Sequence, residues 1–267
     1  MTLKQKIRAY SASFRMGVKL CLSDRADLFS TVLIYGTLLV VFDAIYRVMP
    51  IEQLGRADIT RAHLLWYFVT TEIIVVSVQG YEREFGRLIA EGMLTTMLQR
   101  PGNMMGLLLT RIFGTVFMNS IFVSGFALCI APLLTGTGFP VPPVFIPLFI
   151  LSVFMGVVIF LLTGYCVGML EILGPYSRPF NWMVNKLIFT FGGLFFPVIF
   201  FPKILQVIVH FTPCPAVISV PGNFMLNPTW AQVRQGLLEQ ILWVFIMAVF
   251  AAQMEKRLIT RVLVKGD

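Results

Sequence analysis

The apolar residues of this chain come in runs of about twenty, and few folds can accommodate such runs. One run of that length crosses the hydrocarbon core of a bilayer as a helix, and in lipid only helices and closed barrels satisfy every backbone polar group. The sequence is 57% hydrophobic and only 13% charged, whereas soluble domains carry about 25% charged residues. The sequence therefore predicts an all-α polytopic membrane protein.

The order of the apolar runs predicts one transmembrane domain over residues 1–267, with six transmembrane helices. The N-terminal segment differs from the others because its apolar residues recur at helical spacing between lysines and arginines, which is typical of an amphipathic helix on an anionic membrane surface. We expect an interfacial helix at 1–22, spans at 28–48, 63–80, 105–134, 144–170, 183–200 and 237–254, and a polar tail at 255–267.

The segment 201–234 is too long for a turn and too apolar for a solvated loop. Five prolines divide it into pieces of about ten residues, each too short to cross a bilayer. We expect a re-entrant helical hairpin on the extracytoplasmic side. The alternative is a pair of poorly spaced additional spans.

Lysine and arginine are distributed unevenly between the two sides of this topology. Of the 21 in the chain, 16 lie in the N-terminal segment, the second and fourth loops and the C-terminal tail, and five lie in the other loops. Because positive flanks are retained in the cytoplasm, both termini are predicted to be cytoplasmic. The net charge of +8 follows from this membrane pattern, so we expect no nucleic-acid partner.

The stretch Tyr81–Pro101 joins the second and third spans on the predicted cytoplasmic side. Phe85, Leu88, Ile89, Met93 and Met97 fall on one side of a helix, and Arg83, Arg87 and Glu91 on another. This spacing predicts an amphipathic helix at 81–101 on the membrane surface.

Motifs for enzymatic chemistry are missing from the sequence. Two histidines and four widely separated cysteines offer neither a metal cluster nor a disulfide framework, so we expect no metal site. The Gly-rich loop that ends in Gly-Lys-Ser/Thr and holds ATP phosphates is also missing. We therefore expect no enzyme activity and no cofactor bound by this chain.

Two carboxylates fall inside predicted spans, where a charge costs at least about 2.5–3.5 kcal/mol on insertion scales. Asp43 lies near the end of the first span and four residues before Arg47, so a structural ion pair is the preferred interpretation. Glu72 lies in the second span near Trp66 and Tyr67. It either lines a path for a cationic or amphipathic substrate or forms an inter-helix hydrogen bond in its protonated form.

Two motifs carry a resemblance to a known transporter family. Glu91, Gly92, Leu94, Leu98 and Pro101, within EGMLTTMLQRP, resemble the E-G-x-L-x-x-x-L-x-x-P pattern that follows the second span of ABC-2 permeases, the type-2 ABC exporters. Residues 195–221, FFPVIFFPKILQVIVHFTPCPAVISVP, are similar to that family's aromatic-proline run before the last span. With the order of the spans, these motifs resemble the bacterial branch whose permeases are often encoded as two different subunits.

The resemblance implies a permease subunit in the bacterial inner membrane that works as a dimer with two separate ATPase subunits. A heterodimer with a second permease subunit is preferred over a homodimer, and ATP and Mg²⁺ would bind to the ATPases. The segment 81–101 would then be the coupling helix that contacts them. Its expected coupling residues are Glu82, Glu84, Arg87, Glu91, Gly92, Leu94, Arg100 and Pro101.

The cargo expected from the position of Glu72 and from the aromatic residues of the spans is a hydrophobic or cationic small molecule, as in drug efflux. The expected substrate path includes Asp43, Trp66, Tyr67 and Glu72. Export of a lipid-linked glycan or a peptide is the alternative, and a channel or scaffold that works without ATP is a further one.

Overall fold

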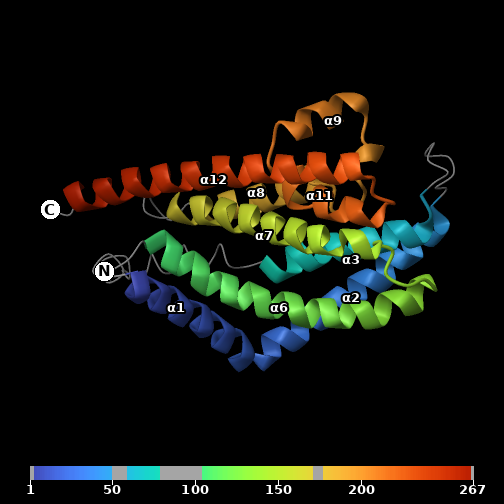
Figure 1. Ribbon diagram of the computed structural model, residues 1–267, viewed down its shortest axis with the longest axis horizontal. Helices are drawn as coiled ribbons and strands as arrows, with labels where there is room; N and C mark the ends of the chain where they lie inside the picture. The colour runs from blue at the N-terminus through green and yellow to red at the C-terminus, as the bar shows by residue number, and fades with distance from the viewer. Residues whose placement is uncertain (1–2, 50–58, 79–103, 171–176, 266–267) are drawn as a thin grey trace.

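The computed structural model describes residues 3–49, 59–78, 104–170 and 177–265, and these form a bundle of helices. No strand occurs among the residues described. Figure 1 shows the long helices lying roughly along one axis, with α1 (Leu3–Ser23) and α2 (Arg25–Val48) on one side and α12 (Trp230–Lys265) on the other. The all-helical prediction is confirmed for these residues.

Five helices are long and apolar enough to cross a bilayer. They are α2, α3 (Arg61–Val78), α6 (Met104–Thr135), the helix formed by the short turn η2 (Pro143–Phe145) and α7 (Ile146–Met169), and α12. Four of these lie close to the predicted spans at 28–48, 63–80, 105–134 and 144–170. The fifth, α12, starts before the span predicted at 237–254 and continues into the predicted tail, because polar residues at both ends extend the helix beyond its apolar part.

The remaining predicted span, 183–200, is not among the five. Its helix α8 (Ser177–Phe191) ends at a turn in which Gly193 adopts a φ of +74°, and the short helix η4 (Val198–Phe200) follows after Pro197. A glycine with positive φ is a common helix C-terminus. The apolar run continues through this turn although the helix does not, and a count of six full spans is not confirmed.

The direction of α8 explains why the two termini lie at the same end of the bundle. Phe189 of α8 packs edge-to-face on Phe160 of α7, with ring centroids 6.4 Å apart, as expected if the chain runs back along α7. After this shorter return, α12 runs the other way. The beginning of α1 and the end of α12 therefore lie at the same end of the molecule (Figure 1).

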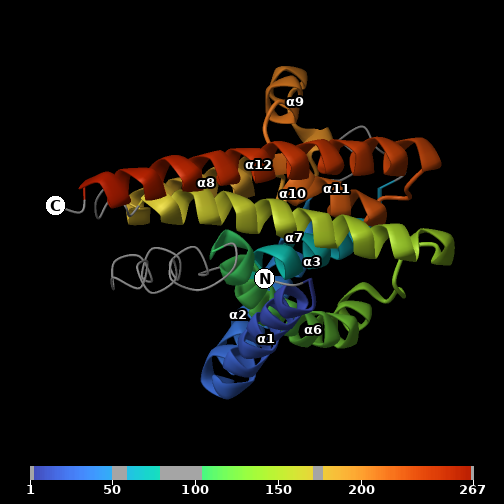
Figure 2. The same cartoon turned by 60° about the vertical axis from the view of Figure 1, so that its left-hand side comes forward.

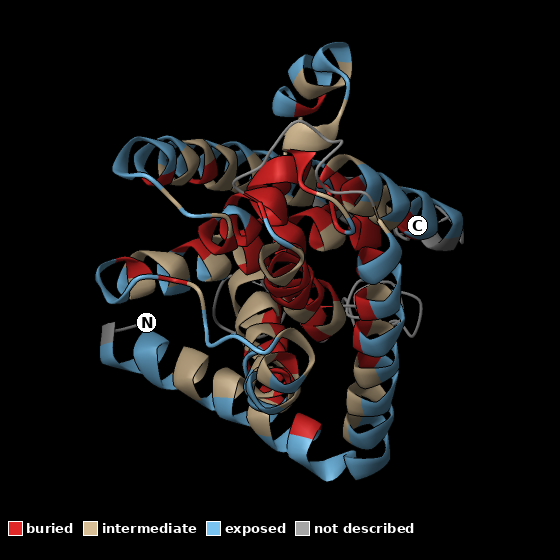
Figure 3. Ribbon diagram, turned by 90° about the vertical axis from the view of Figure 1, so that its right-hand side faces the viewer, coloured by how far each residue is buried: buried red, intermediate tan, exposed pale blue. Residues whose placement is uncertain are grey.

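Helix α3 lies at the centre of the bundle. It contacts α2, α6, α7 and α11 (Ser219–Gly222), and most of its side chains are buried. Figure 3 shows this buried centre surrounded by helices whose outer faces are exposed. Exposed leucine, isoleucine and phenylalanine side chains on α2 and α12 are what a lipid-facing surface requires.

Helix α1 packs along the first half of α6. The two helices meet at glycines: a Cβ atom at Gly17 would overlap the backbone carbonyl of Arg111, and one at Gly114 would overlap that of Phe14. Further along, the Cys21 thiol donates to Asn119 Oδ1 at 3.2 Å. Burial, and then the nearby Asp27 and Asp24, raise the pKa of this thiol, which keeps the donor protonated. The helix predicted to be interfacial at 1–22 thus packs with one face on α6 of the same chain.

The segment predicted to be re-entrant, 201–234, contains three short helices. These are α9 (Lys203–His210), α10 (Cys214–Val217) and α11, and the short turn η5 (Asn223–Met225) follows them. Helices α10 and α11 are buried against α7, α8 and α3, whereas α9 stands off the bundle in Figures 1 and 2. None of the three is long enough to cross a bilayer, and their re-entry into the membrane stays a prediction.

Candidate functional site

The predicted coupling helix at 81–101 lies outside the described residues. Its expected coupling residues, Glu82, Glu84, Arg87, Glu91, Gly92, Leu94, Arg100 and Pro101, therefore remain predictions. The structure does describe the helix that follows this stretch. The backbone N–H of Met105, in the first turn of α6, donates to Glu255 Oε1 on α12 at 3.3 Å, so the start of α6 is held against α12.

Asp43 is the hub of an ion cluster that joins α2 and α3. Its carboxylate is 4% exposed and accepts from Arg47 Nε at 2.9 Å and from Arg61 Nε at 3.1 Å. Arg61 Nη2 also contacts Asp43 and donates to the Leu134 carbonyl at the end of α6, at 2.9 Å. These contacts correspond to the structural ion pair preferred on sequence grounds, because the carboxylate is occupied by two arginines.

Trp66 and Tyr67 are both buried at the first part of α3 and point to different neighbours. Trp66 Nε1 donates to Thr137 Oγ1 at 3.4 Å, and its ring packs edge-to-face on Phe139. The Tyr67 hydroxyl donates to the Gly193 carbonyl at 2.7 Å and lies against the side chain of Ser219. In this conformation both side chains hold the surrounding loops in place.

Glu72 lies deeper in α3 and is 4% exposed. It is close enough to Tyr35 and Tyr46 of α2 for electrostatic interaction. Within the described part of the chain no hydrogen bond or ion pair joins its carboxyl group to another residue. The inter-helix hydrogen bond considered from the sequence is therefore not formed with a described residue.

The four expected substrate-path residues do not gather around one cavity in the described structure. Asp43 faces Arg47 and Arg61, Trp66 faces the loop after α6, and Tyr67 faces the turn after α8. Glu72, on α3, lies near Tyr35 of α2. Trp66, Tyr67 and Glu72 lie on the central helix α3, and Asp43 on α2 contacts Arg61, the first residue of α3.

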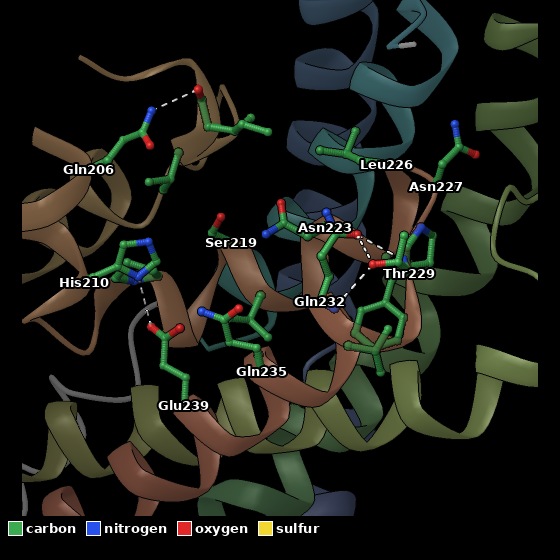
Figure 4. A pocket seen from close by; sticks show the side chains of 18 of the residues that line it. Gln206, His210, Ser219, Asn223, Leu226, Asn227, Thr229, Gln232, Gln235 and Glu239 are labelled. Atoms are coloured by element: carbon green, nitrogen blue, oxygen red, sulfur yellow. Dashed lines mark hydrogen bonds and ion pairs between the residues drawn. The ribbon is translucent and has the colours of Figure 1, made fainter. Parts of the chain in front are cut away.

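A pocket of about 390 Å³ lies between α9 and the first turns of α12 (Figure 4). These elements lie toward the end of the bundle away from the two termini (Figure 1). Its walls come from α9, α11, η5, the first turns of α12 and Ile59 before α3. The polar side chains that line it are Gln206, His210, Ser219, Asn223, Asn227, Thr229, Gln232, Gln235 and Glu239. Tyr67 of α3 lies directly behind it, through its contact with Ser219.

Helix α9 forms one wall of this pocket with its polar face. Gln206 and His210, four residues apart, both line the pocket. Ile204, Val207, Ile208 and Phe211 repeat at i, i+3, i+4 and i+7 on another face and are 51–80% exposed. The helix therefore separates a polar pocket from an apolar outer surface.

His210 and Glu239 link α9 to α12 across one edge of the pocket. His210 Nδ1 and Glu239 Oε1 are 3.7 Å apart, which permits an ion pair when the imidazole is protonated (Figure 4). The side chain of His210 is more than half exposed, whereas that of Glu239 is mostly buried. No cluster of three or more His, Cys, Asp or Glu suited to a metal ion occurs in the described ranges.

The sequence did not indicate this pocket, because its polar residues are spread over α9, α11, η5, the loop before α12 and the first turns of α12. One signal was available: Gln232, Gln235 and Glu239 recur at i, i+3 and i+7. These positions form a polar stripe at the start of a helix that otherwise resembles a span. The predicted bounds divided this stripe, because Gln232 fell in the re-entrant segment 201–234, Glu239 in the span at 237–254 and Gln235 between the two.

The sequence was compared with known protein families and with curated proteins. A sequence profile described as "ABC-2 family transporter protein" matches residues 32–261, which is most of the chain. A search of curated proteins found no match to this chain.

Proposed function

The chain belongs to the ABC-2 transporter family, and we propose that it is the transmembrane permease subunit of an ATP-driven exporter. The observation that carries the proposal is the family match over residues 32–261. This match covers, in whole or in part, all five helices that are long enough to span a bilayer. Members of this family are membrane components without an ATPase motif of their own. The sequence agrees, since it has no phosphate-binding Gly-Lys-Ser/Thr loop.

The permease lies in the bacterial inner membrane with both termini in the cytoplasm. Two observations support this orientation: 16 of the 21 lysines and arginines lie in segments assigned to that side. In addition, the beginning of α1 and the end of α12 lie at one end of the bundle (Figure 1). The polar pocket then lies toward the extracytoplasmic side.

Energy comes from two copies of an ABC ATPase subunit that bind below the membrane, with ATP and Mg²⁺ on those subunits. Residues 81–101 are the coupling helix, and its acidic and basic residues fit a groove on the ATPase. Movement of this helix would reach α6 directly, and α12 as well, because Glu255 holds the first turn of α6. A second permease subunit completes the path, as a heterodimer in preference to a homodimer.

Purification of the tagged chain with the products of neighbouring genes tests this proposal. We expect an ATPase subunit to co-purify, together with a second permease, and its ATP turnover to rise when the chain is present in liposomes. The matched control is the same chain without residues 81–101, with membrane insertion checked by protease protection. A full-length chain that binds no ATPase and leaves its turnover unchanged would favour a channel or scaffold instead.

We propose a hydrophobic or cationic small molecule as the cargo, with Glu72 as its contact in the path. The supporting observation is a buried carboxyl group that the described residues do not pair, because an intramembrane carboxyl group is costly and usually faces a partner or a cavity. Export of a lipid-linked glycan is the second candidate, favoured by the amide-rich lining of the pocket.

The variant Glu72→Gln separates a substrate role from a packing role, because it removes the charge and keeps the shape. We expect export of a fluorescent cationic dye from inverted vesicles to fall about tenfold or more, since a charge-assisted contact contributes roughly 1.5–3 kcal/mol. Gln253→Glu, on the exposed face of α12, is a control for general effects of charge. Unchanged dye export by Glu72→Gln would rule out the substrate role.

A further inference from the structure

In the pocket between α9 and α12, existing hydrogen bonds determine whether the side-chain amides of Gln206 and Gln232 are left to donate or to accept. Gln206 Nε2 donates to the carbonyls of Ile199 and Phe201, at 3.0 and 2.7 Å, so the amide oxygen is left to accept. Gln232 Oε1 accepts from both the backbone N–H and the hydroxyl of Thr229, at 2.9 Å each, so the amide nitrogen is left to donate. The two walls therefore present one acceptor and one donor with set orientations (Figure 4).

Two further side-chain amides between these walls keep both their hydrogen-bond donors and their acceptor available. Asn223 on η5 and Gln235 on α12 line the pocket, and neither side chain is hydrogen-bonded to another described residue. A side-chain amide carries two donor hydrogens beside an acceptor oxygen. The hydroxyl group is the ligand function that matches both, because it donates and accepts from one atom.

The charges around the pocket do not favour an ionic ligand. Neither lysine nor arginine is among the described residues that line it, so the pocket lacks the cations that a phosphate or sulfate requires. The one carboxylate among those described residues, Glu239, faces His210 across 3.7 Å and is mostly buried, so a cationic ligand would have to compete with that imidazole. The lining therefore favours an uncharged ligand with several hydroxyl groups.

The surroundings of the pocket suggest how such a ligand arrives. The apolar face of α9, Ile204, Val207, Ile208 and Phe211, is exposed immediately outside it. Aliphatic side chains such as Val198, Val220 and Leu226 fill the pocket wall between the polar groups. A molecule with an apolar part could therefore stay on the outer face of α9 while its polar part entered.

We propose that the pocket formed by Gln206, Asn223, Gln232 and Gln235 binds an uncharged, hydroxyl-rich group such as a sugar. Its extracytoplasmic position rests on the proposed function, so the site would hold the polar part of a molecule at the exit side of the permease. The volume, about 390 Å³, lies within the usual range of small-ligand sites. The sugar could belong to the headgroup of a glycolipid or be free in solution, since the two share this chemistry.

Binding is measured on the chain alone in lipid nanodiscs, with radiolabelled dodecyl maltoside below its critical micelle concentration as the probe. The test variant is Asn223→Leu with Gln235→Met, which keeps side-chain size and removes both amides. Gln253→Met makes the same chemical change on an exposed face of α12, away from the pocket. Unfolding temperatures are recorded for each protein.

Saturable binding to the wild type and to Gln253→Met is expected, with affinity about tenfold or more lower in the double variant. Competition by free maltose assigns the site to a soluble sugar, and binding without competition assigns it to a glycolipid headgroup. Equal affinity in the double variant would overturn the proposal. So would tighter binding of dodecyltrimethylammonium that is lost in Glu239→Gln, since this would make the pocket a cation site.

A second measurement does not depend on variants. Dodecyl maltoside should slow amide hydrogen exchange of the wild type in residues 219–239, and exchange unchanged at saturating probe would contradict the site. Because no ATPase is present in either experiment, failure of this proposal leaves the permease assignment intact. Loss of ATPase binding would leave the sugar site intact in turn.

Discussion

Asp43 holds two arginines that come from different parts of the chain, Arg47 from its own helix and Arg61 from the start of α3. The carboxylate is buried, whereas the side chains of Arg47 and Arg61 are 57% and 32% exposed. Breaking a fully buried pair costs about 3–5 kcal/mol, but these arginines can reach water when the carboxylate is lost. The cluster therefore contributes less than a fully buried pair would.

We expect Asp43→Asn to lower the free energy of unfolding by about 1–3 kcal/mol, a discount from the cost of a fully buried pair. Thermal unfolding in nanodiscs measures this change. Asp27→Asn, the same substitution at an exposed position of α2, is the matched control. If the two variants unfold at the same temperature, the Asp43 cluster does not stabilise the bundle.

At the scale of single residues, the sequence could indicate Asp43 and Arg47 as partners because they lie four positions apart on one helix. It could not indicate Arg61, whose position depends on how α3 packs against α2. The same limit applies to Tyr67, which contacts Gly193 from a distant part of the chain. Side-chain partners from separate helices require the fold itself.

At the scale of elements, the packing of α1 on α6 is a contact that the hydrophobic pattern of α1 did not indicate. A helix with one apolar face can cover either lipid or another helix, and its hydrophobic pattern does not distinguish them. The glycines at 17 and 114 do, since each allows the backbone of the other helix to come close. Such close approach is typical of small residues between membrane helices.

Gly114→Ala tests this contact, because the added Cβ would overlap the Phe14 carbonyl. We expect a loss of about 1–3 kcal/mol in the free energy of unfolding, the usual cost of overpacking. Gly125→Ala, in the same helix with open space around the position, should be neutral or stabilising by up to about 1 kcal/mol. Equal stability of the two variants would show that α1 does not pack tightly on α6.

Helix bounds were predictable where an apolar run and a helix coincide, as in α2, α3, α6 and α7. They were not predictable at α8, because hydropathy continues through Gly192 and Gly193 while the backbone turns. The pocket was missed for a related reason. Its polar groups lie on α9, α11, η5 and the start of α12, and only the fold brings them together.

At the scale of the whole molecule, the proposed mechanism needs motion at the predicted cytoplasmic end to reach α3 and the pocket. The described contacts offer a route: the start of α6 is tied to α12 through Glu255, and α12 forms one wall of the pocket near Glu239. Helix α3 reaches the same pocket through Tyr67 and Ser219. Helix α12 therefore connects the end that holds the termini with the pocket toward the other end.

Residues 81–101 are proposed to couple a partner ATPase to transport, and reversing charges within this segment is the direct test of that role. The variants are Arg87→Glu and Glu91→Lys, and Arg257→Glu, exposed on α12, is the matched control. In proteoliposomes with the co-purified ATPase, ATP turnover and cargo export are measured together. In both test variants we predict normal membrane insertion with ATP turnover uncoupled from export, and in Arg257→Glu we predict normal coupling. Export at the wild-type rate by Arg87→Glu and Glu91→Lys would contradict a coupling role for residues 81–101.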